Sequence, residues 1–372
     1  MAWPQRLVLT GAFTLVAGFA AWHLFVPFIE GTFGFRPDDF WSYSSGFRRR
    51  ALPGELIYRI DLLTGAAPLL FSVLLWASTL VVFAALLSEI HRTLPWPQVL
   101  LLLSSPVLLI YEVDTEILLL LPFAALGLPA SLRPWGLLLA ILLAMAIREL
   151  ALLFYAPMLW ALLLRGSPAL RLMTVLTTAA AVLVLLAPVT PDYHLEREYW
   201  PERGIDGLRS THLYGFAELG LADVVPMHLE MIRAHLVQAL PGFVAFLLFC
   251  CGLLRARTGR PLPALWFLVV YLVFAVLSVD YGRYHYLFFA WALFASTEVA
   301  SPWFDFREVE TLGRRMAPRT VEAFDAALCW LHERAGMVLL VIFVLAPAGP
   351  WVERYELHPR FVEFALEVLE RL

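Results

Sequence analysis

Apolar stretches close to 20 residues long follow one another along most of this chain, and they constrain its fold more than any other feature. About 20 apolar residues in a helix span the hydrocarbon core of a bilayer. The stretches lack the alternation of a barrel strand, so lipid favours helices. Hydrophobic residues make up 61% of the chain and charged residues only 16%, whereas soluble domains carry about 25% charged residues. The sequence therefore predicts an all-α, polytopic transmembrane helix bundle.

Eleven apolar segments are predicted to be helices: 7–28, 63–88, 98–111, 117–130, 135–147, 150–164, 169–188, 239–254, 262–278, 285–298 and 336–348. The third and fourth segments are short for a full span, as are the fifth and sixth, and each pair is also consistent with one interrupted helix. The bundle thus has about 11 helices, or nine if both pairs merge. Residues 1–348 are expected to form one transmembrane domain, and 349–372 an amphipathic C-terminal tail.

The distribution of arginine predicts the orientation, because cytoplasmic loops carry an excess of basic residues. With a cytoplasmic N-terminus, the short inner loops hold Arg92, Arg133, Arg165, Arg171, Arg255, Arg257 and Arg260. The short outer loops then hold only two arginines. The longer outer loops are 29–62, whose five arginines are an exception to the rule, and 189–238. We expect these two loops to form one face of an extracytoplasmic cavity.

The segment 303–335 is amphipathic and falls on the cytoplasmic side in this arrangement. In "TVEAFDAALCWLHERA" the apolar residues Val321, Phe324 and Leu328 recur at helical spacing, which is typical of a helix lying in the membrane interface. The preceding "REVETLGRRMAPR" is rich in arginine, which binds anionic lipid. Membrane lipids are therefore expected partners, and the bundle is expected to carry short interfacial helices.

All 27 basic residues are arginine, and the chain has neither lysine nor asparagine. Both absent residues use A-rich codons, which indicates a GC-rich bacterial genome. The predicted location is therefore the bacterial inner (cytoplasmic) membrane, with the polar face toward the periplasm. The net charge of -4 gives no indication of a nucleic-acid partner.

A concentrated cluster of both charges follows the first apolar segment, in "FRPDDFWSYSSGFRRRALPGEL". Asp38 and Asp39 are candidate catalytic residues, since a carboxylate there can deprotonate a hydroxyl, and a pair can instead hold a divalent cation such as Mg²⁺ or Mn²⁺. They are equally consistent with an N-cap of the following segment. Arg48, Arg49 and Arg50 are candidates for binding a phosphate at the membrane surface, or for contacting lipid headgroups.

Three further clusters fall on the same predicted outer face. They are "YEVDTE" with Glu112, Asp114 and Glu116, "IREL" with Arg148 and Glu149, and "DYGRYHYL" with Asp280, Arg283 and His285. The first can contact a sugar or a metal, or can be a solvated turn. The second can bind substrate or hold helix ends together. In the third, the arginine can clamp a phosphate while tyrosines stack on sugar rings, although tyrosine is also common at membrane interfaces.

The layout of an N-terminal helix, an acidic first outer loop and many helices resembles the type C glycosyltransferases, which use polyprenyl-phosphate sugars. The stretches "SGFRRRALPGEL" and "DYGRYHYL" are similar to those of a branch of bacterial polytopic membrane proteins. The resemblance implies a catalytic aspartate in the first outer loop, which corresponds here to Asp38 or Asp39. We expect no counterpart here of the outer domain that many of these enzymes append.

The resemblance also implies an activity and its partners. A hexosyl or pentosyl group would move from a polyprenyl-phosphate donor to a glycan, lipid or protein acceptor on the extracytoplasmic face. No cofactor is firmly implied beyond the divalent cation considered above. Three other classes stay open: a polysaccharide polymerase or ligase of the outer face, a non-enzymatic lipid or glycan transporter, and a purely structural subunit. Charges that lie mostly at helix ends argue against a transporter.

Overall fold

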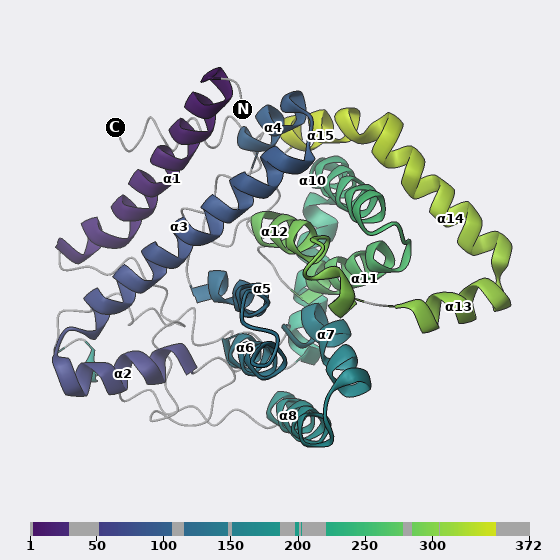
Figure 1. Cartoon of the computed structure of the whole chain (residues 1–372). Helices are drawn as coiled ribbons and strands as arrows, with labels where there is room; N and C mark the ends of the chain where they lie inside the picture. The colour runs from purple at the N-terminus through teal and green to yellow at the C-terminus, as the bar shows by residue number, and fades with distance from the viewer. Residues whose placement is uncertain are drawn as a thin grey trace. The chain divides into compact units, whose positions relative to one another are not determined.

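The computed structural model describes residues 3–29, 52–105, 115–147, 151–186, 198–200, 202, 221–277, 285–304 and 306–346 (Figure 1). Every regular element in these ranges is a helix and none is a strand, which confirms the predicted all-α class. Three of the described helices are long and apolar enough to cross a membrane: Leu69–Thr93, Leu240–Thr258 and Pro318–Leu345. The larger bundle of about 11 spans stays a prediction.

Helical backbone is found in every predicted apolar segment. The helices are α1 (Trp3–Ile29), α2 (Leu52–Thr64), α3 (Ala67–Thr93), α4 (Trp96–Leu103), the 3-10 helix η4 (Thr115–Leu120), α5 (Leu121–Ala125), α6 (Arg133–Ile147), α7 (Ala151–Arg165), α8 (Pro168–Leu186), α10 (Leu221–Thr258), α11 (Leu262–Leu277), α12 (His285–Ala295), η8 (Ser301–Phe304), α13 (Arg307–Met316), α14 (Pro318–Trp330), the π-helical turn η9 (Leu331–Ala335) and α15 (Gly336–Leu345). The predicted tail 349–372 lies outside the described residues.

Two boundaries differ from the expectation. Helix α4 ends at Leu103, where the backbone N–H of Ser104 bonds carbonyls of the last turn. The third apolar segment, predicted as 98–111, thus has an α-helix that ends eight residues early. Helix α10 begins at Leu221, so the second predicted outer loop, 189–238, becomes helical well before its end. Strong helix formers such as Met, Leu, Glu and Ala carry the helix past Pro226, which removes only one backbone hydrogen bond.

The chain divides into two compact units. The first contains Met1–Ala84 and Tyr111–Leu221. In it α1 packs on α3, where the indole N–H of Trp76 donates to the carbonyl of Ala17 at 3.2 Å. Helices α5 to α8 pack on one another, and the buried hydroxyl of Tyr155 donates to the carbonyl of Leu119. A backbone acceptor thus satisfies the polar end of a buried tyrosine.

The second unit contains Ala85–Ile110 and Ala222–Leu372, and aromatic side chains dominate its core. Phe246 of α10, Tyr271 of α11 and Phe288 of α12 are each almost fully buried. The ring centroids of Phe246 and Tyr271 lie 5.5 Å apart, and those of Tyr271 and Phe288 lie 4.7 Å apart. Aromatic contacts at these distances hold the three helices side by side, as Figure 1 shows.

Ion pairs tie the C-terminal end of α10 to two other helices of the second unit. Arg255 makes a bidentate pair with Asp325 of α14, and its Nη2 lies 3.0 Å from Oδ2. Arg257 Nη2 lies 3.3 Å from Oε2 of Glu89, near the end of α3. All four side chains are less than a quarter exposed, so these pairs are screened less than surface pairs. The two pairs hold the last turns of α10 against the end of α3 and against α14.

Loss of the Arg255–Asp325 pair is expected to destabilise the protein, because bidentate hydrogen bonds between charged groups are stronger than neutral ones. We expect Arg255→Ala and Asp325→Ala each to lower the free energy of unfolding by about 1–2 kcal/mol in a thermal or denaturant titration. The double variant should cost little more than either single one. Arg314→Ala, which breaks an exposed pair with Glu310, is the matched control and should leave the midpoint unchanged. Strictly additive effects at Arg255 and Asp325 would contradict this.

Candidate functional site: a buried carboxylate joined to an aromatic cluster

Most of the predicted site residues lie outside the part of the chain that the structure describes. They are Asp38, Asp39, Arg48, Arg49, Arg50, Glu112, Asp114, Arg148, Glu149, Asp280 and Arg283. Glu116 belongs to the helical backbone of η4, and only its backbone is described. The predicted convergence of these clusters on one cavity therefore stays a prediction, and so does a divalent cation at Asp38 and Asp39.

Within the predicted charged clusters, His285 is the one residue whose side chain the structure describes. It is the first residue of α12 and is 0% exposed. Its Nε2 lies 2.8 Å from the hydroxyl of Tyr271 on α11. The ring of Phe246 stands edge-on to the imidazole at 4.5 Å, and that of Phe343 lies at 5.4 Å. The histidine is thus held from three helices of the second unit.

The burial of His285 favours a positioning role over direct contact with a substrate. The residue closes the "DYGRYH" stretch, in which Asp280 and Arg283 precede it by five and two positions. A hydrogen bond to Tyr271 and aromatic packing fix the backbone at the start of α12. When the first residue of a helix is held in place, binding a ligand next to it costs less conformational entropy.

The structure also reveals a buried carboxylate that was not predicted from the sequence. Asp61 lies in the last turn of α2 and is 3% exposed. The hydroxyl of Tyr199 donates a hydrogen bond to Asp61 Oδ2 at 2.8 Å. Taking a carboxylate out of water is unfavourable unless it is hydrogen-bonded or paired. A nearly buried aspartate in an apolar protein is therefore a functional candidate.

Aromatic rings pack against the tyrosine that bonds this carboxylate. The ring of Tyr199 lies 4.9 Å from that of Tyr58, one turn before Asp61 on α2, and 4.9 Å from that of Trp200. Trp200 is fully buried. The guanidinium of Arg59 lies 5.7 Å from the ring centroid of Tyr58 and pairs with the Glu55 carboxylate at 2.7 Å. We call Tyr58, Asp61, Tyr199 and Trp200 the Asp61 cluster.

A signal for Asp61 is present in the sequence. In "LPGELIYRIDLLT" the buried positions of α2 are Gly54, Ile57 and Asp61, which recur at three- and four-residue spacing. This is the buried stripe of an amphipathic helix, and an acid in that stripe is the feature to notice. The tyrosine that bonds it lies 138 positions away in sequence, and no local pattern indicates that partner.

Asp61 and Trp200 are as deeply buried as His285, so the Asp61 cluster is suited to position the two segments that carry it. Among the side chains that the structure describes, no three His, Cys, Asp or Glu residues come together in a way that could hold a metal ion.

Comparison of the chain with protein-family models, with curated proteins and with solved structures finds no match.

Proposed function

We propose that the chain is a membrane glycosyltransferase that moves a sugar from a polyprenyl-phosphate donor to an acceptor on the extracytoplasmic face of the bacterial inner membrane. The acceptor is a glycan, a lipid or a protein. In this proposal the chain forms a type C glycosyltransferase-like bundle of about 11 helices with a cytoplasmic N-terminus. The three long apolar helices support a membrane location.

Exposed apolar side chains add support for a bilayer around the protein. On α3, Leu70, Leu74 and Val81 are exposed, whereas Leu75 and Phe83 of the same helix are buried. Exposed leucine and valine along one side of a long helix are typical of contact with lipid, because water would disfavour such a stripe.

One structural observation carries the functional proposal. The hydrogen bond between Asp61 and Tyr199 joins the end of the first predicted outer loop, 29–62, to the second, 189–238. Helix α2, which carries Asp61, begins two residues after Arg50. The contact thus joins α2, which follows Arg48–Arg50, to Tyr199 of the second predicted outer loop. This is the arrangement that a site built from both loops requires.

The chemistry assigns a separate task to each charge in the first loop. The acceptor hydroxyl attacks the anomeric carbon, forming the new glycosidic bond while the bond from that carbon to the phosphate oxygen breaks. Asp38 or Asp39 takes the hydroxyl proton. The polyprenyl phosphate leaves with the electron pair, and Arg48, Arg49, Arg50 or Arg283 stabilises its developing charge. The polar loop just above the bilayer is where a lipid-linked donor and a soluble acceptor can meet.

The test is a transfer assay with the purified full-length protein in liposomes. Polyprenyl-phosphate sugars carrying radiolabelled hexose or pentose are supplied with a mixture of glycan, lipid and peptide acceptors. We expect label to appear in an acceptor together with stoichiometric release of polyprenyl phosphate. Chain-length ladders would instead identify a polymerase. Labelled donor that crosses the bilayer without being cleaved would identify a transporter and contradict the proposal.

A further inference from the structure

Helix α13 separates its apolar and polar side chains onto opposite faces. Val309, Leu312 and Met316 fall on one face at helical spacing, and they are 52%, 56% and 77% exposed. Such a helix in a soluble protein would turn these side chains to the core. Here the apolar face points outward along the whole helix, in the part of the chain that the structure describes.

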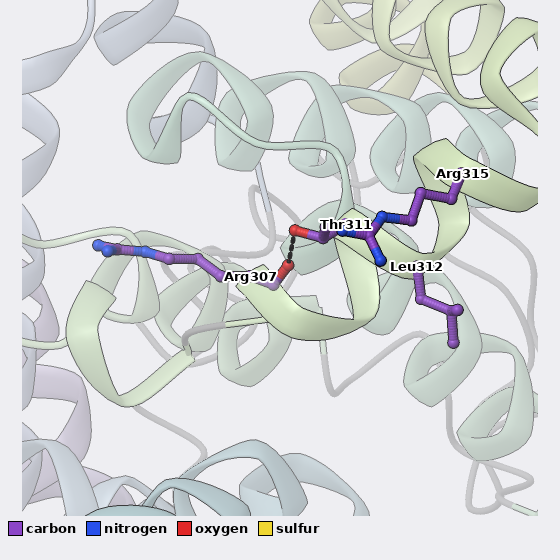
Figure 2. A pocket seen from close by; sticks show the side chains of 4 residues that line it. All are labelled: Arg307, Thr311, Leu312 and Arg315. Atoms are coloured by element: carbon purple, nitrogen blue, oxygen red, sulfur yellow. Dashed lines mark hydrogen bonds between the residues drawn. The ribbon is translucent and has the colours of Figure 1, made fainter.

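The opposite side of α13 presents cationic groups. Arg307, Thr311 and Arg315 follow one another at intervals of four residues, and with Leu312 they line a shallow surface hollow of about 360 Å³. Figure 2 shows the side chain of Arg315 running back along the helix toward Thr311, whereas Arg307 extends the other way. The Thr311 hydroxyl donates to the carbonyl of Arg307 at 2.7 Å. Two guanidinium groups and one apolar side chain thus border the same hollow.

The charge balance of this region is positive. Residues 307–319 contain four arginines and two glutamates, a net charge of +2. Arg314 pairs with Glu310 at 2.8 Å, which leaves Arg307, Arg315 and Arg319 to outweigh the remaining glutamate. Guanidinium binds phosphate through two parallel hydrogen bonds and is weakly hydrated. The surface is therefore complementary to anionic phosphate groups.

Contacts of the residues on either side of α13 hold it near the start of α11 and the end of α10. Phe306, directly before α13, packs against Trp266 in the second turn of α11 at 6.2 Å. Helix α14, which follows α13 after one residue, is joined by Asp325 to Arg255 in the last turns of α10. Helix α14 forms the first part of the candidate span Pro318–Leu345. Helix α13 thus directly precedes one candidate membrane helix and is held near the end of a second, α10.

We propose that α13 lies flat on the membrane surface and binds the phosphate groups of anionic lipids. Val309, Leu312 and Met316 enter the boundary between headgroups and acyl chains. Arg315, next to Met316 in sequence, lies about a quarter turn from the apolar face and reaches lipid phosphates, whereas Arg307 lies opposite that face and adds positive charge near the lipid surface. The lipid surface covers the exposed apolar face, and the adjoining span keeps the helix at that surface. This inference requires membrane insertion and is independent of the proposed transfer chemistry.

The experiment uses the full-length protein with an environment-sensitive fluorophore on α13. Cys250 and Cys251 are buried and Cys329 is partly exposed, so Cys329→Ser provides the background. Met316→Cys places the probe on the apolar face, and Thr311→Cys places it on the opposite side as the matched control. Each protein is studied in nanodiscs of phosphatidylcholine, in nanodiscs of equal parts phosphatidylcholine and phosphatidylglycerol, and in lipid-free amphipol.

In anionic nanodiscs we expect the probe at position 316 to show blue-shifted emission and protection from aqueous iodide. The probe at position 311 should stay accessible to iodide. Each arginine near an anionic surface contributes about a fivefold preference, so Arg307→Gln with Arg315→Gln should lower the ratio of docked to undocked helix by roughly 30-fold. Arg6→Gln with Arg171→Gln removes the same charge outside the segment 303–335 and should leave the probe unchanged.

Three results would overturn the proposal. Equal iodide accessibility at positions 316 and 311 in anionic nanodiscs would show that the apolar face is not in lipid. Protection of equal strength in amphipol and in anionic nanodiscs would show that the cover of this face is not specific to lipid. Protection of equal strength in both kinds of nanodisc, unaffected by the arginine changes, would exclude recognition of anionic lipid.

Discussion

Asp38→Asn or Asp39→Asn is expected to reduce sugar transfer by about 10²- to 10⁴-fold, which is the range that a positioned general base contributes. The amide is nearly isosteric with the carboxylate but cannot accept the proton of the attacking hydroxyl. Donor binding should change little, because the proposal assigns the donor phosphate to the arginines. The measurement is the initial rate of label transfer in liposomes at saturating donor, together with the donor Kd.

Glu298→Gln is the matched control for this experiment. It removes one exposed carboxylate in a segment that the predicted topology places in the cytoplasm, and its rate should equal that of the unchanged protein. The variant with the large rate loss identifies the catalytic aspartate. If both Asp38→Asn and Asp39→Asn keep the full rate at matched expression, the mechanism built on this loop is wrong.

Asp61→Ala is expected to impair both stability and donor recognition. It removes a hydrogen bond to a charged group, and such a bond contributes about 1.5–3 kcal/mol. The midpoint of thermal unfolding in detergent should fall. Because α2 follows the arginine cluster directly, loss of the tie to Tyr199 should also raise KM for the donor more than it lowers kcat. Asp61→Asn keeps an acceptor oxygen and should restore much of both quantities.

Tyrosine variants separate the hydrogen bond from the packing of the rings. Tyr199→Phe removes only the hydroxyl that donates a hydrogen bond to Asp61. It should reproduce the rise in KM for the donor. Tyr58→Phe changes the neighbouring ring of the same cluster in the same way, but its hydroxyl does not bond Asp61, so it serves as the control. A fall in stability with an unchanged KM for Asp61→Ala and Tyr199→Phe would mean that the Asp61 cluster only holds the fold together.

The fold class was predictable because composition and segment length suffice for it. Apolar stretches in a chain with few charges leave helices as the structure that satisfies the backbone, and each predicted stretch contains helix. Boundaries were less predictable. The sequence predicted an outer loop over 189–238, whereas the chain is helical from Leu221. The segment 303–335, predicted to be amphipathic, contains α13 and α14, and its second part belongs to the candidate span Pro318–Leu345.

The site was harder to predict, because its contacts join residues distant in sequence. His285 was noticed through its neighbours Asp280 and Arg283, but its burial beside Tyr271 depends on how three helices pack. Asp61 escaped notice since its partner Tyr199 belongs to another segment. A pattern in the sequence shows which side chains share a helix face. It does not show which two faces meet.

The 38 residues of α10 make it about 57 Å long at 1.5 Å per residue, nearly twice the roughly 30 Å thickness of the hydrocarbon core. Its apolar part, Leu240–Thr258, accounts for about 29 Å. In the proposed membrane arrangement the first half of α10 therefore lies outside the hydrocarbon core, and its length nearly equals the thickness of that core. Pro241 lies at the junction and lacks the N–H that would bond the carbonyl of Val237. The helix thus loses a hydrogen bond at the height where water first becomes available to replace it.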